Sequence, residues 1–167
     1  MTKTKTLTLC GVLTALALAL SYVERFIPLQ LAIPLPGIKL GLANVVTLTA
    51  LCRFGKGHAF GILTARCLLG AIFAGLSSLA FSLTGGLLAL GVMCLAAKSR
   101  HLSLFGVSVL GAAAHNLGQI LAAAVLMQSF YVAAYLPWLL LVSISTGLFT
   151  GGLTAGVLHL LPGEVRN

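Results

Sequence analysis

Acidic residues are nearly missing from this chain of 167 residues, which has Glu24 and Glu164 as its only carboxylate side chains. Both lie at the ends of apolar segments, so we expect no Asp or Glu to be buried. Secondary transporters that use protons or sodium place ionisable residues inside the membrane, which disfavours that class here. Prenyl transfer that depends on Mg²⁺ is disfavoured as well, because clustered carboxylates are needed to hold the ion on a diphosphate.

Signatures of other chemistry are also missing. The chain contains no G-x-x-x-x-G-K-[ST] motif, so it has no P-loop for ATP. Its cysteines form no C-x-x-C pair, which argues against a zinc site or a disulfide framework; they are Cys10, Cys52, Cys67 and Cys94. A serine or cysteine nucleophile beside His115 remains an open alternative that no motif supports. We therefore expect no catalytic residue, no cofactor and no metal.

Charge is scarce and apolar residues dominate the composition. Charged residues make up 7% of the chain and hydrophobic residues 59%, with a mean hydropathy of +1.11. About a quarter of a soluble domain is charged, and a soluble core of this size cannot hide such an apolar excess. The composition predicts one integral membrane domain over residues 1–167. The net charge of +8 does not indicate nucleic-acid binding, because the basic residues lie between apolar runs, where topology signals belong.

The apolar runs predict an all-α bundle of six transmembrane helices. They cover residues 6–23, 40–52, 57–75, 80–97, 103–128 and 135–161. A spanning helix needs about 20 residues, and only the second run is clearly shorter. Before that run, Pro28, Pro34 and Pro36 interrupt an apolar stretch. We expect a loop over 25–38 at the membrane surface, followed by a half-buried helix that begins near Lys39.

Lysine and arginine counts predict the orientation of the helices. One set of helix ends carries seven basic residues, namely Lys3, Lys5, Arg53, Lys56, Lys98, Arg100 and Arg166. The other set carries only Arg25 and Lys39. The positive-inside rule then places both termini in the cytoplasm. The N-terminal run resembles a signal peptide, but it continues to Tyr22 and further apolar segments follow, so we expect it to remain as the first helix.

Polar residues inside the apolar runs predict a binding site. The stretch "GAAAHNLGQI" (111–120) carries three such residues within five positions, although polar side chains are costly in lipid. At 1.5 Å per residue, His115 and Gln119 lie at about the same depth as three positions on other helices, between the bilayer midplane and the outer surface. Those positions are Asn44, Arg66 and the pair Gly85–Gly86. The predicted substrate-binding residues are Lys39, Asn44, Arg66, Gly85, Gly86, His115, Asn116 and Gln119. The alternative is that carbonyl groups neutralise Arg66 and that the polar residues of 111–120 only bridge helices.

A stripe of small residues on the first helix predicts contact with a partner. Gly11, Ala15 and Ala19 recur at i, i+4 and i+8, a spacing that lets helix backbones approach closely. We expect this face to dock a separate membrane protein, with internal packing as the alternative.

Five blocks of the sequence carry a resemblance to a known family. They are "PGIKLGLANVVTL" (36–48), "RCLLGAIFAG" (66–75), "FSLTGGLLAL" (81–90), "GAAAHNLGQI" (111–120) and "TGLFTGGLTAG" (146–156). The chain resembles the bacterial membrane family of heptaprenyl diphosphate synthase component I, also called the Gx transporter family. That family is similar to the S components of energy-coupling factor transporters, six-helix proteins that capture nutrients and pass them to a scaffold subunit with two ATPases. The resemblance implies a multi-pass protein of the bacterial plasma membrane. It also implies that an A-x-x-x-A element, matched here by Ala15 and Ala19, docks the scaffold, and that the loop after the first helix covers the site.

These observations favour a substrate-binding, S component-like membrane subunit of an energy-coupling factor-type importer. Its substrate would be a small vitamin-, flavin- or quinone-like or anionic molecule, and its partners the bilayer, a scaffold subunit and ATPase subunits. The first alternative is a non-catalytic membrane partner of an enzyme of the heptaprenyl diphosphate or quinone pathway. The second is a purely structural membrane subunit of a redox complex.

Overall fold

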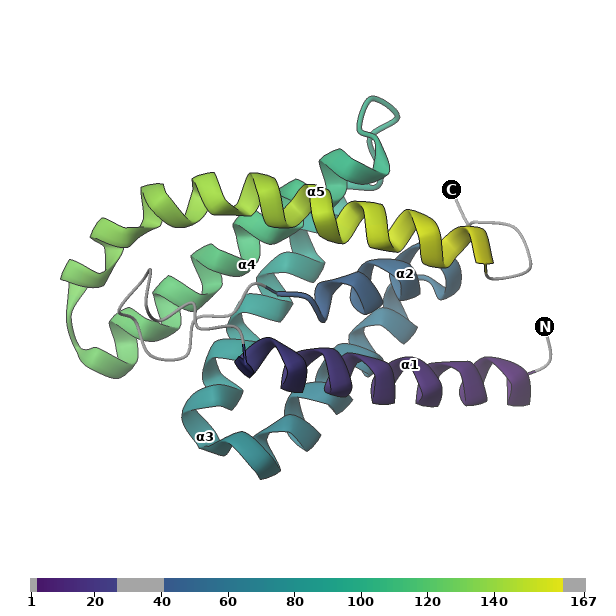
Figure 1. The fold of residues 1–167 in the computed structure, drawn as a ribbon, viewed down its shortest axis with the longest axis horizontal. Coiled ribbons are helices and arrows are strands. Elements are labelled where there is room, and N and C mark those ends of the chain that lie inside the picture. The colour runs from purple at the N-terminus through teal and green to yellow at the C-terminus, as the bar shows by residue number, and fades with distance from the viewer. Residues whose placement is uncertain (1–2, 27–40, 161–167) are drawn as a thin grey trace.

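The computed structural model describes residues 3–26 and 41–160, and the regular structure in these residues is helical throughout. The long helices are α1 (Lys3–Val23), α2 (Asn44–Phe54), α3 (Lys56–Ala96), α4 (Leu104–Met127) and α5 (Leu136–Leu160). Two short 3₁₀ helices, η1 (Glu24–Phe26) and η3 (Phe130–Tyr135), follow α1 and precede α5. The all-α prediction is confirmed. Helix α1 begins, and helix α5 ends, at the same end of the bundle (Figure 1).

Helix α3 is broken at Gly75, which has φ 81° and ψ 172° inside an otherwise helical segment. A residue with a Cβ rarely adopts this conformation, so glycine is suited to the break. The halves 56–74 and 76–96 run in different directions (Figure 1). The break lies at the boundary predicted between the third and fourth apolar runs.

Four helical stretches in the described residues are long and apolar enough to cross a membrane. They are Lys3–Val23, the whole of α3, Leu104–Met127 and Phe130–Leu160. Helix α2, with 11 residues, is too short to meet that criterion. Four candidate spans are therefore established, and the count of six remains a prediction.

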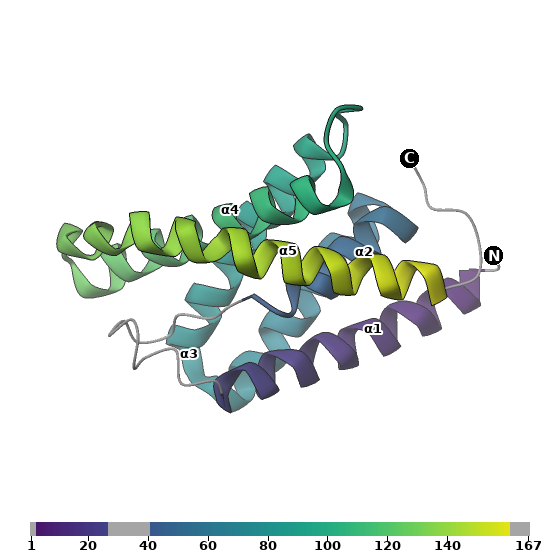
Figure 2. The same ribbon diagram turned by 45° about the horizontal axis from the view of Figure 1, so that its top comes forward.

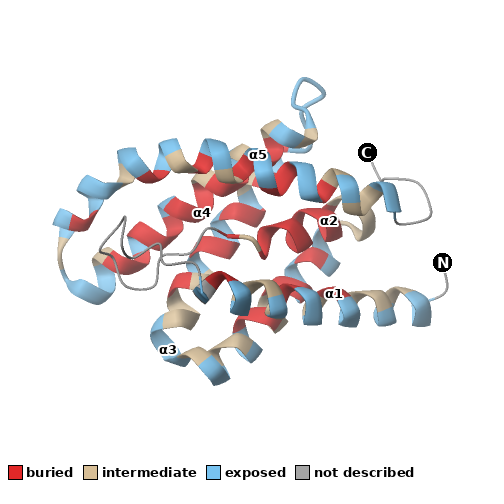
Figure 3. Ribbon diagram, viewed as in Figure 1, coloured by how far each residue is buried: buried red, intermediate tan, exposed pale blue. Residues whose placement is uncertain are grey.

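Helix α2 lies at the centre of the bundle, which differs from the expected half-buried helix beginning near Lys39. It begins at Asn44, after Gly41 at φ 82°, and Lys39 itself lies outside the described residues. Residues 44–51 are all buried, because α2 packs against α1, α3 and α5. Figure 3 shows the buried residues gathered on α2 and α4. The prediction of a half-buried helix was wrong, because the longer helices surround α2 on all sides and leave it no exposed face.

Helix α1 lies at the edge of the bundle (Figure 2). Only Leu13 and Ala17 of this helix are buried, and they pack toward α2 and α3. Most of its surface is exposed (Figure 3). The remainder of this apolar surface, which includes Leu7 and Val12, must therefore face lipid or another protein.

Close helix contacts depend on small residues elsewhere in the bundle. A Cβ added to Gly118 of α4 would lie 2.7 Å from the Cα of Gly85 on α3, and one added to Gly147 of α5 would lie 2.5 Å from the Cα of Val109. These glycines allow backbone contact between neighbouring helices. The contacts hold α4 between α3 and α5 and fix the position of its polar residues.

Candidate ligand-binding site

Arg66, on the first half of α3, is buried with 6% of its surface exposed. Its Nη1 donates a hydrogen bond to the Oγ of Ser21 near the end of α1, over 3.4 Å. Within the described part of the chain, its Nε and Nη2 are buried without a hydrogen-bond partner. A buried charge is stable only when it is paired and hydrogen-bonded. The guanidinium therefore has two donor atoms suited to an acceptor from a ligand.

Glu24 lies in η1, immediately after α1, and only 3% of its surface is exposed. Its carboxylate accepts a hydrogen bond from the backbone N–H of Gly41, and its negative charge acts on Arg66. The expectation that no carboxylate is buried was wrong. The 3₁₀ turn at the end of α1 places Glu24 inside, where its charge partly balances that of Arg66.

The His115 imidazole lies between two glycines. A Cβ added to Gly85 would lie 2.9 Å from both Cε1 and Nδ1 of His115, and one added to Gly41 would lie 3.3 Å from its Cδ2. The same Cβ added to Gly41 would lie 2.9 Å from Nδ2 of Asn44. The absence of side chains at positions 41 and 85 therefore makes the room in which His115 and Asn44 lie together.

Gly86 connects this region to Arg66. A Cβ added there would lie 3.5 Å from Nη2 of Arg66 and 2.5 Å from Cδ1 of Leu63. Gly85 and Gly86 thus face the imidazole and the guanidinium from consecutive positions. The structure brings together five of the predicted site residues, which we call the polar cluster: Asn44, Arg66, Gly85, Gly86 and His115. Glu24 and Gly41 join it.

The other predicted residues have different places. Asn116 Nδ2 donates a hydrogen bond to the Leu139 carbonyl of α5 over 3.0 Å, so this side chain bridges two helices. Gln119 is fully buried one turn beyond His115 on α4. Lys39 lies outside the described residues.

A cavity of about 440 Å³ lies between the end of α1 and the first half of α3, and Arg66 is not among the residues that line it. It is lined by Leu18, Ala19, Ser21, Tyr22, Gly70 and Phe73. Because Ser21 lines the cavity and bonds to Arg66, one hydrogen bond connects the guanidinium to this space. We call it the Ser21 cavity.

The small residues predicted to form a docking stripe on α1 are all exposed, but one of them also lines the Ser21 cavity. Gly11, Ala15 and Ala19 are all exposed, and a Cβ added to Gly11 would meet nothing within 4 Å. Ala19 lines the Ser21 cavity, however, so a change there would alter both the outer face and the cavity. Ala15 is therefore the better probe for a docking surface.

Sequence reasoning missed Ser21, Glu24 and Gly41. The signal for Glu24 was its isolation, since it is the only acidic residue before position 164. Gly41 lies in the "KLGLAN" block, but nothing in the sequence indicated its contact with Glu24. For Ser21 no signal was available, because its role depends on how α1 crosses α3.

The chemistry available in the polar cluster is hydrogen bonding with one buried cation and one buried anion. Residues 3–26 and 41–160 contain no group of three His, Cys, Asp or Glu side chains placed to hold a metal ion. Amide, imidazole and guanidinium groups together are suited to binding a polar group of a small molecule.

Comparison with known proteins gives one match. The family model described as heptaprenyl diphosphate synthase component I matches residues 13–157. No curated protein matches the chain, and no solved structure matches it. The matched range includes every residue of the polar cluster, and also Glu24 and Gly41. The chain therefore belongs to the heptaprenyl diphosphate synthase component I family.

Proposed function

We propose that this chain is a substrate-binding membrane subunit of an energy-coupling factor-type importer. The observation that carries the proposal is the buried Arg66, which has two donor atoms without partners in the described structure and is linked through Ser21 to a cavity. Ionisable residues inside membrane segments mark functional sites by default.

The cavity and the polar cluster together indicate the class of ligand. A volume of about 440 Å³ lies within the range of small-molecule sites. Its walls include apolar and aromatic groups from Leu18, Tyr22 and Phe73. A suitable ligand has an aromatic or aliphatic body in the cavity and a carboxylate or carbonyl group directed to Arg66.

Glu24 limits the charge that this site accepts. Its carboxylate is buried and its negative charge acts on Arg66, so it offsets part of the positive charge of the guanidinium. A neutral group rich in carbonyls, or at most a group with one negative charge, is then favoured over a group with several negative charges, which would leave a larger excess charge in a low dielectric.

Transport requires an energy source from another subunit in this proposal. The exposed face of α1 around Ala15 is suited to a scaffold subunit, because small residues permit close helix contact. The scaffold would in turn carry ATPase subunits. Both termini would be cytoplasmic, on the side where those ATPases act.

A second function is favoured by the family description. The name heptaprenyl diphosphate synthase component I fits a non-catalytic membrane partner of the enzyme that forms heptaprenyl diphosphate. In that case the α1 face would dock the catalytic subunit, and the polar cluster would bind a ligand for that complex.

Affinity purification of the full chain from its native membrane in a mild detergent tests the proposal. Recovery of a membrane scaffold with ATPases, lost in Ala15→Trp but kept in Ala15→Ser, is the expected result. Recovery of a prenyl diphosphate synthase instead would support the second function. If Ala15→Trp keeps every partner, the docking surface lies elsewhere.

A further inference from the structure

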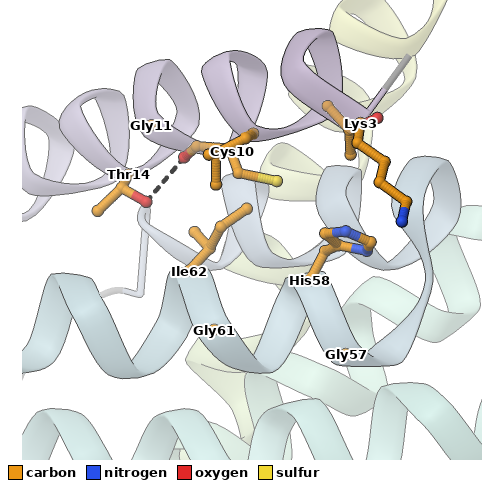
Figure 4. A pocket seen from close by; sticks show the side chains of 10 residues that line it. Lys3, Cys10, Gly11, Thr14, Gly57, His58, Gly61 and Ile62 are labelled. Carbon is orange, nitrogen blue, oxygen red and sulfur yellow. Dashed lines mark hydrogen bonds between the residues drawn. The ribbon is translucent and has the colours of Figure 1, made fainter. Parts of the chain in front are cut away.

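A second and larger cavity lies between α1 and α3, near the beginning of both helices. Its volume is about 840 Å³, and Figure 4 shows the side chains that line it. We call it the Lys3 groove. It is distinct from the Ser21 cavity, and no residue lines both.

The Lys3 groove is polar at one end and apolar along its length. At the polar end, Lys3 extends from α1 toward the part of α3 that carries His58 (Figure 4). Farther along, Cys10 and Ile62 face each other across the groove (Figure 4). Leu7 adds an apolar side chain that is 74% exposed. The lining therefore has the two parts that an amphiphile requires.

Hydrogen bonding fixes the orientation of the histidine. His58 Nδ1 lies 3.0 Å from the carbonyl oxygen of Phe54. Since a carbonyl only accepts, Nδ1 carries the hydrogen and donates. In the neutral ring, Nε2 then carries only a lone pair and can accept a hydrogen bond from an occupant of the groove, such as a hydroxyl group.

The polar end is strongly basic. Three further basic residues lie at the end of the bundle where α1 and α3 begin and α2 ends. They are Lys5 on α1, Arg53 on α2 and Lys56 on α3. The one acidic residue in the described part of the chain, Glu24, follows the opposite end of α1, which is about 30 Å long. Among the described residues no acid lies at this end, and these positive charges attract anionic headgroups of the membrane surface.

Glycines keep the Lys3 groove open. A Cβ added to Gly11, Gly57 or Gly61 would meet no atom within 4 Å. These glycines differ from Gly118 and Gly147, where a Cβ would meet backbone. The groove is therefore not closed by packing between α1 and α3.

We propose that the Lys3 groove is a binding site for an anionic phospholipid of the bilayer. The phosphate lies at Lys3, a hydroxyl of the headgroup faces Nε2 of His58, and an acyl chain lies along Leu7, Cys10 and Ile62. The lipid supplements the small contact by which Leu13 and Ala17 hold α1 to the bundle. A soluble anion would gain nothing from the apolar walls, and a partner helix would not explain the basic end.

Native mass spectrometry of the full-length protein, with phosphatidylglycerol or phosphatidylcholine of identical acyl chains, tests this proposal. The wild type should keep phosphatidylglycerol in preference to phosphatidylcholine. Lys3→Gln should weaken phosphatidylglycerol binding about fivefold, the weight of one lysine near an anionic surface. Lys5→Gln is the matched control, because it removes the same charge from a residue that does not line the groove.

A second pair of variants tests the apolar part. Gly61→Leu should occupy the groove and remove the phosphatidylglycerol adduct. Gly91→Leu changes an exposed glycine with equally open surroundings and should keep it. If Gly61→Leu fails to fold, the comparison of Lys3→Gln with Lys5→Gln decides alone.

Three results would overturn the proposal. Equal losses of phosphatidylglycerol binding in Lys3→Gln and Lys5→Gln would indicate that the basic end attracts anionic lipids without a defined site. Equal binding of phosphatidylglycerol and phosphatidylcholine would indicate that only acyl chains are bound. An undiminished adduct in folded Gly61→Leu would place the lipid elsewhere.

Discussion

The imidazole of His115 occupies the space that a side chain at Gly85 would need, since a Cβ there would lie 2.9 Å from its Nδ1. Gly85→Ala should therefore displace His115 and cost about 1–3 kcal/mol in the free energy of unfolding, typical of overpacking. Gly91→Ala is the control, because that glycine has no neighbour within 4 Å and alanine favours a helix by about 1 kcal/mol. Denaturation in detergent measures both, and equal stability of the two variants would contradict the close contact.

Glu24 and Arg66 should be energetically coupled. Both side chains are buried and the charge of Glu24 acts on Arg66, so removing either one leaves the other less well compensated, at a cost of about 1–3 kcal/mol. Glu24→Gln and Arg66→Gln should each destabilise the protein, and the double variant should lose less than the sum. Unfolding free energies of the four proteins give the coupling. Strict additivity would show that the two charges do not interact.

Asn116 should matter for stability and not for ligand binding. Its amide donates to the Leu139 carbonyl, so it connects α4 to α5. Asn116→Ala should lower stability by about 1 kcal/mol, as for other hydrogen bonds between membrane helices. Binding of the co-purified ligand should persist in this variant. A folded and stable Asn116→Ala that no longer binds ligand would move Asn116 into the site.

The face of α1 around Ala15 should tolerate bulk in the isolated protein. Ala15 is exposed, whereas Ala17 on the same helix is fully buried. Ala15→Trp should fold and keep its ligand but lose partner proteins, while Ala17→Trp should lose stability through overpacking. Thermal denaturation of the two variants, followed by co-purification, separates these effects. Equal destabilisation would mean that Ala15 belongs to internal packing.

Much of the fold follows from local physics that the sequence displays. Apolar runs of about 20 residues predicted α1, α4 and α5, and Gly75 ended the third run where α3 breaks. The burial of α2 was not predictable, because its central position depends on how the longer helices pack. A helix shorter than a bilayer can be surrounded by protein, and its sequence alone does not distinguish this from partial insertion.

The candidate site was predictable only in part. Depth along separate helices put Arg66, Gly85, Gly86 and His115 at one level, because helix rise is regular, and in the structure Gly85 lies against His115 and Gly86 against Arg66. Depth could not separate Asn116 from His115, since adjacent residues differ by 100° around the helix and face different neighbours. Burial of Glu24 depended on the short turn after α1, which no periodic pattern indicates.

Ligand occupancy in Arg66 variants tests the central claim most directly. The full-length protein is purified in mild detergent, and bound small molecules are identified and counted by native mass spectrometry. The wild type and Arg100→Ala, an exposed control, should carry the same small ligand. Arg66→Ala should remain folded and lose it, because an acceptor group left unpaired in a buried site costs about 1–3 kcal/mol. A folded Arg66→Ala that retains the ligand at the occupancy of the wild type would contradict the assignment of the polar cluster as a binding site.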